Sequence, residues 1–515
     1  MKTIAVGSDD LSLDQLVTLS RPGAMIRIPR PVHAALARSR KVVEEAVRSG
    51  KTVYGVNTGF GKLAGVSVEA AKLEVLQRNL ILSHATGVGE PLDPEVCRLA
   101  LALRIHNLAR GFSGVRLQLL DVMVRLFNAD LIPVLPSQGS VGASGDLAPL
   151  AHMALPLLGQ GEVYDGGRVG RTKRLAGRAA LRRISRAPVA LAAKEGLALI
   201  NGTQVMTAIG VLAVARARDL NLIADIACAT TVEALRASER PFVAKVHQLR
   251  PHPGQARTAA NLRSLLHGSK VMLSHRTCGK VQDAYSIRCS PQVHGAAKDA
   301  WRFAADVLVT EASSVTDNPL VFPDGDVVSA GNFHGQPVSQ ALDFLAISVS
   351  TLANISERRI ENLVNPDISG LPPFLAHQPG LESGLMISQV VAAALASENK
   401  SLAHPASVDT IPTSANREDH VSMGVTAARH AAQVVANSET VVAIELLCAA
   451  QGLDCGEPLA PGRGVAAAHA KLRESVRPLD RDRYLAPDIA ATLALVRGGG
   501  LLDAVRGVPG VSVSC

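Results

Sequence analysis

The chain has 515 residues, of which 47% are hydrophobic and 19% charged, and its formal net charge is +8. This balance excludes a disordered chain, because disordered segments carry more charge and too few apolar side chains to form a core. Aromatic residues make up only 3%, so the core must be aliphatic. The abundance of Ala, Leu and Val favours helices over sheets.

The apolar runs, the N-terminal residues and the cysteines indicate the cellular compartment of the protein. No uninterrupted apolar run reaches the about 20 residues that span a bilayer. The N-terminus turns acidic at Asp9 and Asp10 before an apolar signal segment could form. The seven cysteines include no Cys-x-x-Cys pair, which argues against a zinc site or a redox pair and predicts reduced thiols. We therefore expect a soluble cytoplasmic protein.

Residues 1–112 alternate short helical patterns with glycine-rich loops, and we expect them to form a smaller N-terminal lobe. One loop, residues 54–62, begins with Tyr54 and contains three glycines. It is flexible enough to cover a site, but it lacks the spacing of a phosphate-binding loop. An amphipathic helix is predicted at about residues 113–127.

The most unusual stretch is residues 137–150, which read Ser-Gln-Gly-Ser-Val-Gly-Ala-Ser-Gly-Asp-Leu-Ala-Pro-Leu. Asp146 precedes a proline at the predicted start of a helix, so the simplest interpretation is a tight turn with an Asp cap. The stretch does not match the Gly-x-Ser-x-Gly nucleophile elbow, because Asp146 occupies the last position of that pattern.

Basic residues are densest between Arg168 and Arg186, where Arg171 also lies. No aromatic side chain interleaves with these charges, as base stacking on nucleic acid would need. A solvated loop followed by a short helix is the interpretation that the segment favours.

Three later segments, residues 191–235, 336–364 and 418–451, are rich in Ala, have apolar residues at helical spacing and contain almost no proline. Each is longer than the about 8–20 residues of an ordinary globular helix. Such helices bury their apolar faces only by packing side by side, so residues 113–515 are predicted to form a helical-bundle domain. The fold class is therefore mainly α, and several helices are apolar enough to be buried between subunits.

The tripeptide at residues 143–145 could also react with itself. If the backbone is compressed, the amide nitrogen of Gly145 can bond to the carbonyl carbon of Ala143. Loss of two waters, one from the Ser144 side chain, then leaves an exocyclic methylidene. Small residues are needed because a bulky side chain on either side would block this geometry. Nearby helix N-termini would make the ring more electrophilic.

The motif of residues 139–150 resembles that of the aromatic amino acid ammonia-lyase family, and the resemblance extends from the Tyr54 loop to residues 480–484. It implies a long-helix bundle of the ammonia-lyase and fumarase–aspartase type. It also implies a methylidene-imidazolone group (4-methylidene-imidazol-5-one, MIO), formed autocatalytically from Ala143, Ser144 and Gly145, with no metal or diffusible cofactor. A homotetramer whose sites are shared between subunits is implied as well.

The same resemblance implies roles for residues elsewhere in the chain. Tyr54 would be the general base that takes the substrate's β-proton, which requires neighbours to lower its pKa. Asn201, in a long helical pattern, would hydrogen-bond MIO or the departing amine. Gln282, Tyr285 and Arg288 recur every third residue, which on a helix places them on one face. Arg288 would clamp the substrate carboxylate, Tyr285 would donate to MIO or shuttle a proton, and Gln282 would orient both.

Three residues bear on the choice of substrate. Ser83 and His84 match the histidine-specific members, whereas tyrosine-specific members carry His-Leu there and phenylalanine-specific members Phe-Leu. Glu418 by its spacing is a cap at the start of a long helix, but the resemblance implies that it pairs with the imidazole of histidine. Aryl-specific members generally have glutamine at that position.

Two more residues complete the implied site. Phe333 would pack against MIO and Met386 would line the ring pocket, although a methionine is more often part of an ordinary core.

The chain departs from the family pattern at Arg417, where glutamine is usual, and at Glu382, where asparagine is usual. Both departures could reshape the pocket or its lid.

The expected reaction is non-oxidative deamination of L-histidine to trans-urocanate and ammonia, the first step of histidine degradation. An MIO-dependent lyase or aminomutase for phenylalanine or tyrosine would share the core catalytic residues but should lack Ser83, His84 and Glu418. A non-enzymatic homologue would need a broken tripeptide. A nucleic-acid-binding protein would need its basic residues on one face and would show salt-dependent DNA binding.

Overall fold

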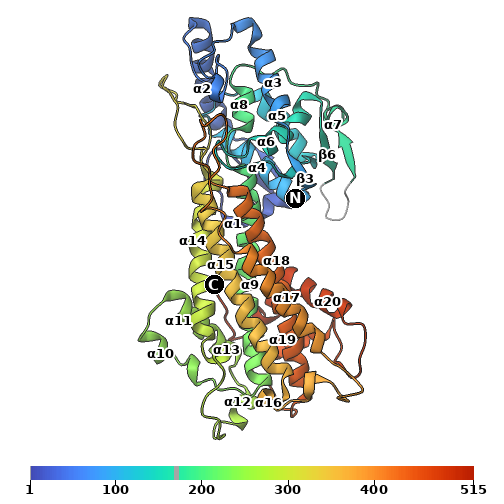
Figure 1. The fold of residues 1–515 in the computed structure, drawn as a ribbon. Coiled ribbons are helices and arrows are strands. Elements are labelled where there is room, and N and C mark those ends of the chain that lie inside the picture. Colours follow the sequence, from blue (N-terminus) through green and yellow to red (C-terminus); the bar gives the residue numbers. More distant parts are fainter. Residues whose placement is uncertain (1, 167–172) are drawn as a thin grey trace. The chain divides into compact units, whose positions relative to one another are not determined.

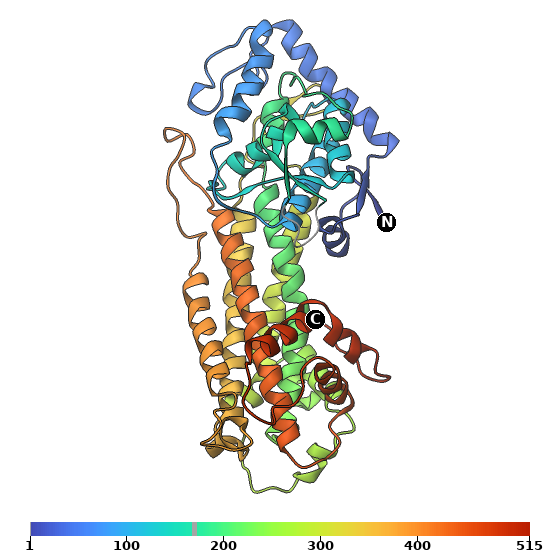
Figure 2. The same cartoon turned by 90° about the vertical axis from the view of Figure 1, so that its right-hand side faces the viewer.

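The computed structural model describes residues 2–166 and 173–515. Arg168 and Arg171 of the basic segment lie outside these ranges. The protein is 59% helical, and helices dominate the ribbon in Figures 1 and 2. The predicted mainly α fold class is confirmed. The described part of the basic segment includes strand β7 (Arg174–Ala176) and helix α7 (Gly177–Arg183). Arg174 of β7 pairs with Glu162 at 3.4 Å.

The chain divides into two compact units. Unit 1 comprises Met1–Leu212, Ala305–Asp343 and Pro405–Arg429, and unit 2 comprises Ala213–Ala304, Phe344–His404 and His430–Cys515. Residues 1–112 all fall in unit 1, whereas residues 113–515 are divided between the two units. The expected domain boundary near residue 112 stays a prediction.

Unit 1 combines short helices with small sheets. Its helices are α1 (Leu13–Ser20), α2 (Arg30–Ser49), α3 (Leu73–His84), α4 (Pro94–Ala109), α5 (Leu117–Asn128), α6 (Leu147–Ala154), α7 (Gly177–Arg183) and α8 (Glu195–Ile200), with 3₁₀ turns η1 (Gly61–Leu63), η2 (Ala70–Lys72) and η3 (Leu155–Leu158). Its strands are β1 (Thr3–Ala5), β2 (Met25–Arg27), β3 (Val88–Pro91), β4 (Leu131–Pro133), β5 (Pro136–Gln138), β6 (Glu162–Asp165), β7 (Arg174–Ala176), β8 (Leu320–Val321) and β9 (Val327–Val328).

The sheets of unit 1 are small. β1 pairs with β2 in parallel, β4, β6 and β7 form an antiparallel sheet, and β3–β5 and β8–β9 are antiparallel pairs. Helix α4 supplies the centre of the core, because all its residues from Cys97 to Ala109 are buried. Helix α5 begins at Leu117 and is strongly amphipathic, with its apolar face buried. The amphipathic helix predicted at about residues 113–127 is confirmed, with a later start.

Four long helices have residues in both units: α9 (Gln204–Ala234), α14 (Ser290–Ser313), α15 (Gln336–Val364) and α18 (Gly424–Cys455). Unit 2 also contains α10 (Ala244–Gln248), α11 (Pro253–Leu265), α12 (Lys270–Ser274), α13 (Tyr285–Arg288), α16 (Pro366–Ser369), α17 (Met386–Leu402), α19 (Arg463–Arg473), α20 (Ala486–Arg497) and α21 (Gly500–Arg506), with 3₁₀ turns η4 (Arg240–Phe242) and η5 (Pro373–Leu375).

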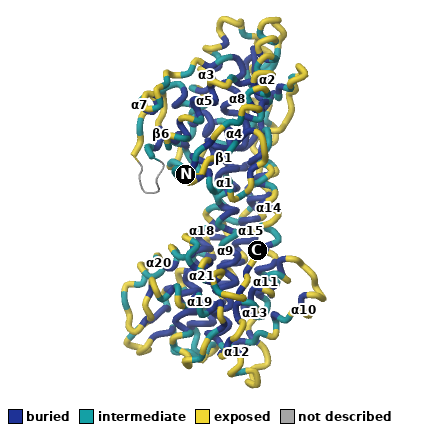
Figure 3. The backbone as a smooth tube through the Cα atoms, turned by 180° about the vertical axis from the view of Figure 1, so that it is seen from behind, coloured by how far each residue is buried: buried dark blue, intermediate teal, exposed yellow. Residues whose placement is uncertain are grey.

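The long helices run side by side in unit 2 in both ribbon views (Figures 1 and 2). Their inner faces are Ala, Leu, Val and Ile side chains; in α18, for example, every residue from Val441 to Ala450 is buried. Figure 3 shows this helical core as buried and the loops around α10 and α12 as exposed. The predicted long-helix bundle is confirmed.

Two of the long helices are long and apolar enough, by length and composition, to cross a membrane. These are Gln336–Val364 and Gly424–Cys455, whose most apolar windows are 61% and 78% buried inside the protein. Burial of this extent is typical of the core helices of a bundle.

The predicted ends of the long segments need correction. The segment at residues 336–364 is one helix, as expected. The segment at 191–235 is broken between Ile200 and Gln204, so it forms two helices, α8 and α9. Helix α18 begins at Gly424, not near residue 418. Both interruptions fall where residues of the candidate site lie.

Candidate active site

The tripeptide of Ala143, Ser144 and Gly145 lies in the loop between β5 and α6. Gly145 has a φ of +73°, and a Cβ placed on it would lie 2.1 Å from the carbonyl oxygen of Gly202. Only glycine fits there. The amide of Asp146 donates to the same Gly202 carbonyl at 2.7 Å. The tripeptide is therefore pressed against the break between α8 and α9.

Asp146 ties this loop to α9. Its side chain is fully buried, and its carboxylate accepts hydrogen bonds from the amides of Val205 and Met206 at 2.8 and 2.9 Å and from the Ser140 hydroxyl at 2.9 Å. Burial raises the pKa of Asp146 to about 6, against these hydrogen bonds, which lower it. Since α6 begins at Leu147, the positive ends of two helices flank the tripeptide, as predicted.

Asn201 contacts the tripeptide directly. The expectation that it lies inside a long helix is wrong, because it follows the last residue of α8 in extended backbone. Its Nδ2 donates to the carbonyl oxygen of Ser144 at 2.9 Å. Its Oδ1 is buried and has no hydrogen-bond partner among the described residues. Such an acceptor is costly unless a ligand supplies a donor.

Arg104 holds the turn that carries Asn201. This arginine is fully buried in α4, and its Nη1 donates to the Asn201 carbonyl and to Gln204 Oε1, each at 2.7 Å. Burial lowers the pKa of Arg104 to about 10. Arg104 was not among the predicted site residues, although an arginine within the mostly apolar residues 99–105 was a signal that a buried polar partner exists.

Glu418 is the second group in contact with the tripeptide. Its Oε1 accepts a hydrogen bond from the Ser144 hydroxyl at 2.7 Å, and its Oε2 accepts one from Thr413. The prediction that it caps a helix is wrong, because it lies in a loop before α18. Residues 414–416 of this loop all have positive φ between 52° and 63°, and none is glycine. Strain of this kind is typical of functional sites.

The loop and the tripeptide border one cavity of about 940 Å³ in unit 1. Its lining includes seven of the predicted site residues: Tyr54, His84, Ala143, Ser144, Asn201, Phe333 and Glu418. Arg417, one of the two departures from the family pattern, also lines the cavity, whereas Glu382 does not. Glu382 accepts a hydrogen bond from the amide of Gln378 at 2.9 Å in unit 2.

Burial sets the protonation of the two titratable rings in the cavity. It raises the pKa of Tyr54, and the nearby charge of Glu418 raises it further, while the Gly61 amide lowers it. The expected lowering of the Tyr54 pKa is therefore wrong for the chain by itself. Burial lowers the pKa of His84, so this imidazole is neutral at pH 7. His84 is the last residue of α3, and its Nδ1 lies 3.1 Å from the Ser83 hydroxyl.

Four predicted site residues belong to unit 2 and do not line this cavity: Gln282, Tyr285, Arg288 and Met386. The expectation that the first three share one helix face is wrong, because α13 spans only Tyr285–Arg288 and Gln282 precedes it. Tyr285 is 71% exposed, and the Arg288 guanidinium lies 4.5 Å from the centre of its ring. Met386 is half-buried at the first position of α17.

No group of three His, Cys, Asp or Glu side chains that could hold a metal ion occurs in residues 2–166 and 173–515. All seven cysteines are free thiols. The polar groups around the tripeptide are hydrogen-bond donors and acceptors of the chain itself. The unpartnered Oδ1 of Asn201 and the carboxylate of Glu418 suit the binding of a small molecule with N–H or O–H donors.

Comparison with known proteins places this geometry in context. Residues 11–474 match the family described as aromatic amino acid lyase. The chain is 54% identical to a histidine ammonia-lyase of Anaeromyxobacter sp. (strain K), over 97% of this chain and 100% of that protein. It is 53% identical to a histidine ammonia-lyase of Symbiobacterium thermophilum, over 99% of each chain.

Solved structures agree with the sequence matches. The crystal structure of histidine ammonia-lyase from Trypanosoma cruzi has a TM-score of 0.91 and 45% identity, over 99% of this chain and 96% of that one. The structure of tyrosine aminomutase from Streptomyces globisporus has a TM-score of 0.92 and 35% identity, over 98% of each chain.

Proposed function

This chain belongs to the aromatic amino acid lyase family, and we propose that it removes ammonia from L-histidine, with trans-urocanate as the other product. The enzyme is a carbon–nitrogen lyase. The observation that carries the choice of substrate is that Glu418 and His84 line the same cavity as Ser144. A carboxylate and a neutral imidazole are suited to binding both nitrogens of a histidine side chain.

The residues of the tripeptide fit the MIO group. Gly145 has no room for a side chain, Ala143 is small and buried, and Asn201 donates to the Ser144 carbonyl. In the proposed maturation the Gly145 nitrogen bonds to the Ala143 carbonyl carbon, and two waters leave, one of them from the Ser144 side chain. MIO supplies an electrophilic carbon for the amino group of the substrate.

The remaining groups bind the substrate and move its proton. Glu418 accepts an N–H of the substrate imidazole, and His84 contacts the other side of that ring. The buried, unpartnered Oδ1 of Asn201 accepts a hydrogen bond from the departing amine. Tyr54 takes the β-proton as a phenolate. Because burial raises its pKa, the phenolate is a minor form at pH 7 and a stronger base when it forms.

We place Gln282, Tyr285, Arg288 and Met386 in the site of another subunit of a homotetramer. Two observations support this: Tyr285 is largely exposed, and the Nε of Arg288 is buried without a partner among the described residues. Apolar side chains on three helices of unit 2 are also exposed and would be covered in an assembly: Phe303, Phe344, Ile347, Ile387 and Val390. Light scattering on the purified protein should give the mass of four chains.

The free thiols support a reducing compartment, so we expect the enzyme to work in the cytoplasm.

The other predicted residues also have roles in the proposed site. Gln282 orients the Tyr285 hydroxyl and the Arg288 guanidinium. Arg288 binds the substrate carboxylate, and Phe333 packs against the MIO ring. Met386 lines the pocket for the substrate ring.

The test is a substrate panel. The purified protein is incubated separately with L-histidine, L-phenylalanine and L-tyrosine, and the ultraviolet absorbance of the conjugated acid is followed. Urocanate from histidine alone is the expected result. Cinnamate or coumarate instead would show that the pocket takes an aryl substrate. An intact mass that is not two waters below the sequence mass would contradict the MIO group.

A further inference from the structure

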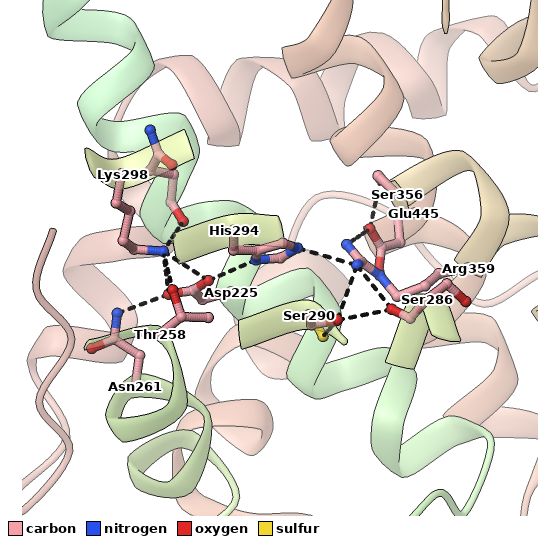
Figure 4. Close-up of polar contacts among 12 residues, drawn as sticks. Asp225, Thr258, Asn261, Ser286, Ser290, His294, Lys298, Ser356, Arg359 and Glu445 are labelled. Carbon is pink, nitrogen blue, oxygen red and sulfur yellow. Dashed lines mark hydrogen bonds and ion pairs between the residues drawn. The ribbon is translucent and has the colours of Figure 1, made fainter. Parts of the chain in front are cut away.

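Unit 2 contains a cluster of charged side chains that the proposed chemistry does not use. Asp225 of α9, His294 and Lys298 of α14, Arg359 of α15 and Glu445 of α18 are all 0% exposed. Figure 4 shows them as one connected set, joined by hydrogen bonds from α9 to α18. We call these five residues the polar cluster.

The polar cluster consists of two ion pairs bridged by one imidazole. Lys298 Nζ lies 2.9 Å from Asp225 Oδ2, and Arg359 binds Glu445 through two parallel hydrogen bonds of 2.6 and 2.7 Å. Burial lowers the pKa of His294 to about 4, so the ring is neutral. Its Nδ1 lies 2.8 Å from Asp225 and its Nε2 lies 3.2 Å from Arg359 Nη1. The charges balance, as burial requires.

The cluster extends to the short helix α13. The carbonyl of Ser286 accepts hydrogen bonds from Ser290 Oγ at 2.8 Å and from Arg359 Nη1 at 3.4 Å. The hydroxyl of Ser286 accepts one from Asn362 Nδ2 at 3.0 Å. Figure 4 shows Ser286 beside Ser290 and Arg359 at this end of the cluster. Both the backbone and the side chain of Ser286 are thus bound from inside the bundle.

The position of Ser286 gives these contacts their significance. It lies between Tyr285 and Arg288 on a helix of only four residues, which is too short to be stable by itself. Ser286 and Ile287 are buried, whereas Tyr285 is exposed and Arg288 is half-buried. The inner face of α13 is fixed to the bundle, and its outer face presents the phenol and the guanidinium.

We propose that Arg359 and Asn362 are positioning residues for the lyase reaction, because through Ser286 they fix the phenol of Tyr285 and the guanidinium of Arg288. This rests on the proposed function, in which those two groups act on the substrate. Ser356, Arg359 and Asn362 recur every third residue of α15, and two of them, Arg359 and Asn362, donate directly to Ser286. Misplacement of a binding group by about 1 Å can cost a hundredfold in rate.

Asn362 is the residue to change, because loss of Arg359 would leave Glu445 buried without its partner and could prevent folding. The test variant is Asn362→Ala. The matched control is Asn399→Ala in α17, since Asn399 is also buried in unit 2 and its Nδ2 donates to a serine hydroxyl, that of Ser438, at 3.1 Å. Asn399 has no contact with α13 among the hydrogen bonds of the described residues.

Two measurements on the full-length assembled enzyme separate positioning from general stability. Hydrogen–deuterium exchange of peptides covering residues 284–290 should rise in Asn362→Ala and stay unchanged in Asn399→Ala. The KM for histidine should rise about tenfold in Asn362→Ala, as expected for one lost buried hydrogen bond, with a smaller fall in kcat. Asn399→Ala should keep both constants within about twofold, even if its melting temperature falls further.

A double-mutant cycle checks the route. Ser286→Ala removes the acceptor of the Asn362 hydrogen bond, so the double variant Ser286→Ala/Asn362→Ala should have the same KM as either single variant.

The outcomes are distinct. Unchanged exchange at residues 284–290, or raised exchange with unchanged KM and kcat, would overturn the proposal. Additive effects in the double variant would overturn the route through Ser286. If the unaltered enzyme has no activity with any of the three amino acids, the proposed function is contradicted instead. The exchange experiment would still decide whether Asn362 anchors α13.

Discussion

The cavity of unit 1 and the polar cluster of unit 2 are both rich in polar side chains, but the backbone supplies them differently. In unit 1 they come from loops and helix ends: Ser144 precedes α6, Asn201 follows α8, and Glu418 precedes α18. In unit 2 they come from the interiors of four long helices. The compressed tripeptide needs backbone that a helix does not offer, whereas the groups of the polar cluster gain precision from rigid helices.

Two glycines, one in each unit, differ in how closely the surrounding residues pack against them. Gly145 and Gly370 both have positive φ, of 73° and 68°. A Cβ on Gly145 would meet backbone at 2.1 Å, while a Cβ on Gly370, after α16, would meet nothing within 4 Å. One position is required by packing at the candidate site, and the other only ends a helix.

The largest effect is expected from Gly145→Ala, compared with Gly370→Ala. The first should stop maturation, because the tripeptide cannot approach Gly202, and activity should fall by at least about a thousandfold. Intact mass should lack the loss of two waters. Gly370→Ala should keep the mature mass and lose only about 1 kcal/mol of stability, the cost of positive φ. Equal loss of activity in both variants would contradict the view that Gly145, and not Gly370, is required at the candidate site.

The next effect concerns Tyr54→Phe, which should lower kcat/KM for histidine by about 10²–10⁴-fold. In the unaltered enzyme the rate should rise with pH through the alkaline range, because the active form is the phenolate and burial holds the Tyr54 pKa above its ordinary value. The residual rate of the variant should lack this rise. Initial rates between pH 7 and 10 test both points, and a variant with the same alkaline rise would exclude Tyr54 as the base.

A third substitution, Glu418→Gln, tests the loop before α18. We expect kcat/KM for histidine to fall about tenfold, since a hydrogen bond to a charged group is replaced by a neutral one. The mature mass should be kept. The control Glu382→Gln, in unit 2 and outside the cavity, should keep kcat/KM within about twofold. If both variants behave alike, Glu418 does not select the substrate.

The smallest effect is expected in unit 2, at a buried carboxyl group of α9 that has a hydrogen-bond partner on only one of its two oxygens. Glu233 accepts from the Gly462 amide at 2.8 Å, and its other oxygen has no partner among the described residues. Burial raises its pKa to about 7, so the folded protein holds this proton above the unfolded value. Stability is therefore lost as pH rises from about 4.5 to 7.

Glu233→Gln cannot ionise and should raise the melting temperature by about 2–4 °C at pH 8, with little change at pH 4. Scanning calorimetry at the two pH values measures this. Glu439→Gln is the control of opposite sign, because Glu439 is buried and paired with Arg216 and Arg497, so the variant should be less stable at pH 8. A gain at pH 4 equal to that at pH 8 would contradict the assigned cause.

The sequence predicted the parts of the molecule that follow from regular spacing. Apolar residues at helical intervals gave the helix at residues 336–364 and the mainly α class. It did not give the breaks at residues 201–203 and before Gly424, because Ala-rich segments with few prolines read as continuous helix. At both places long-range contacts replace helical hydrogen bonds, such as that of the Asp146 amide with Gly202.

The site residues show the same division. Local composition singled out the glycine-rich stretch of residues 137–150, and the resemblance of its motif to the family implied the role of Ala143, Ser144 and Gly145. The sequence also shows Gln282, Tyr285 and Arg288 at every third position. The helix face predicted from this spacing was wrong, because α13 is only four residues long. The polar cluster was not predicted, because its five residues come from four helices that only the fold brings together.

By itself, the sequence determined the mainly α class, the long helix at residues 336–364 and the family to which the motif of residues 139–150 points, because these depend on neighbours along the chain. Only the tertiary structure decided that Glu418 meets Ser144 across 274 positions of sequence, that burial raises rather than lowers the pKa of Tyr54, and that α13 is held from inside the bundle by Asn362. Contact, burial and electrostatic environment arise from residues distant in sequence, and no local pattern encodes them.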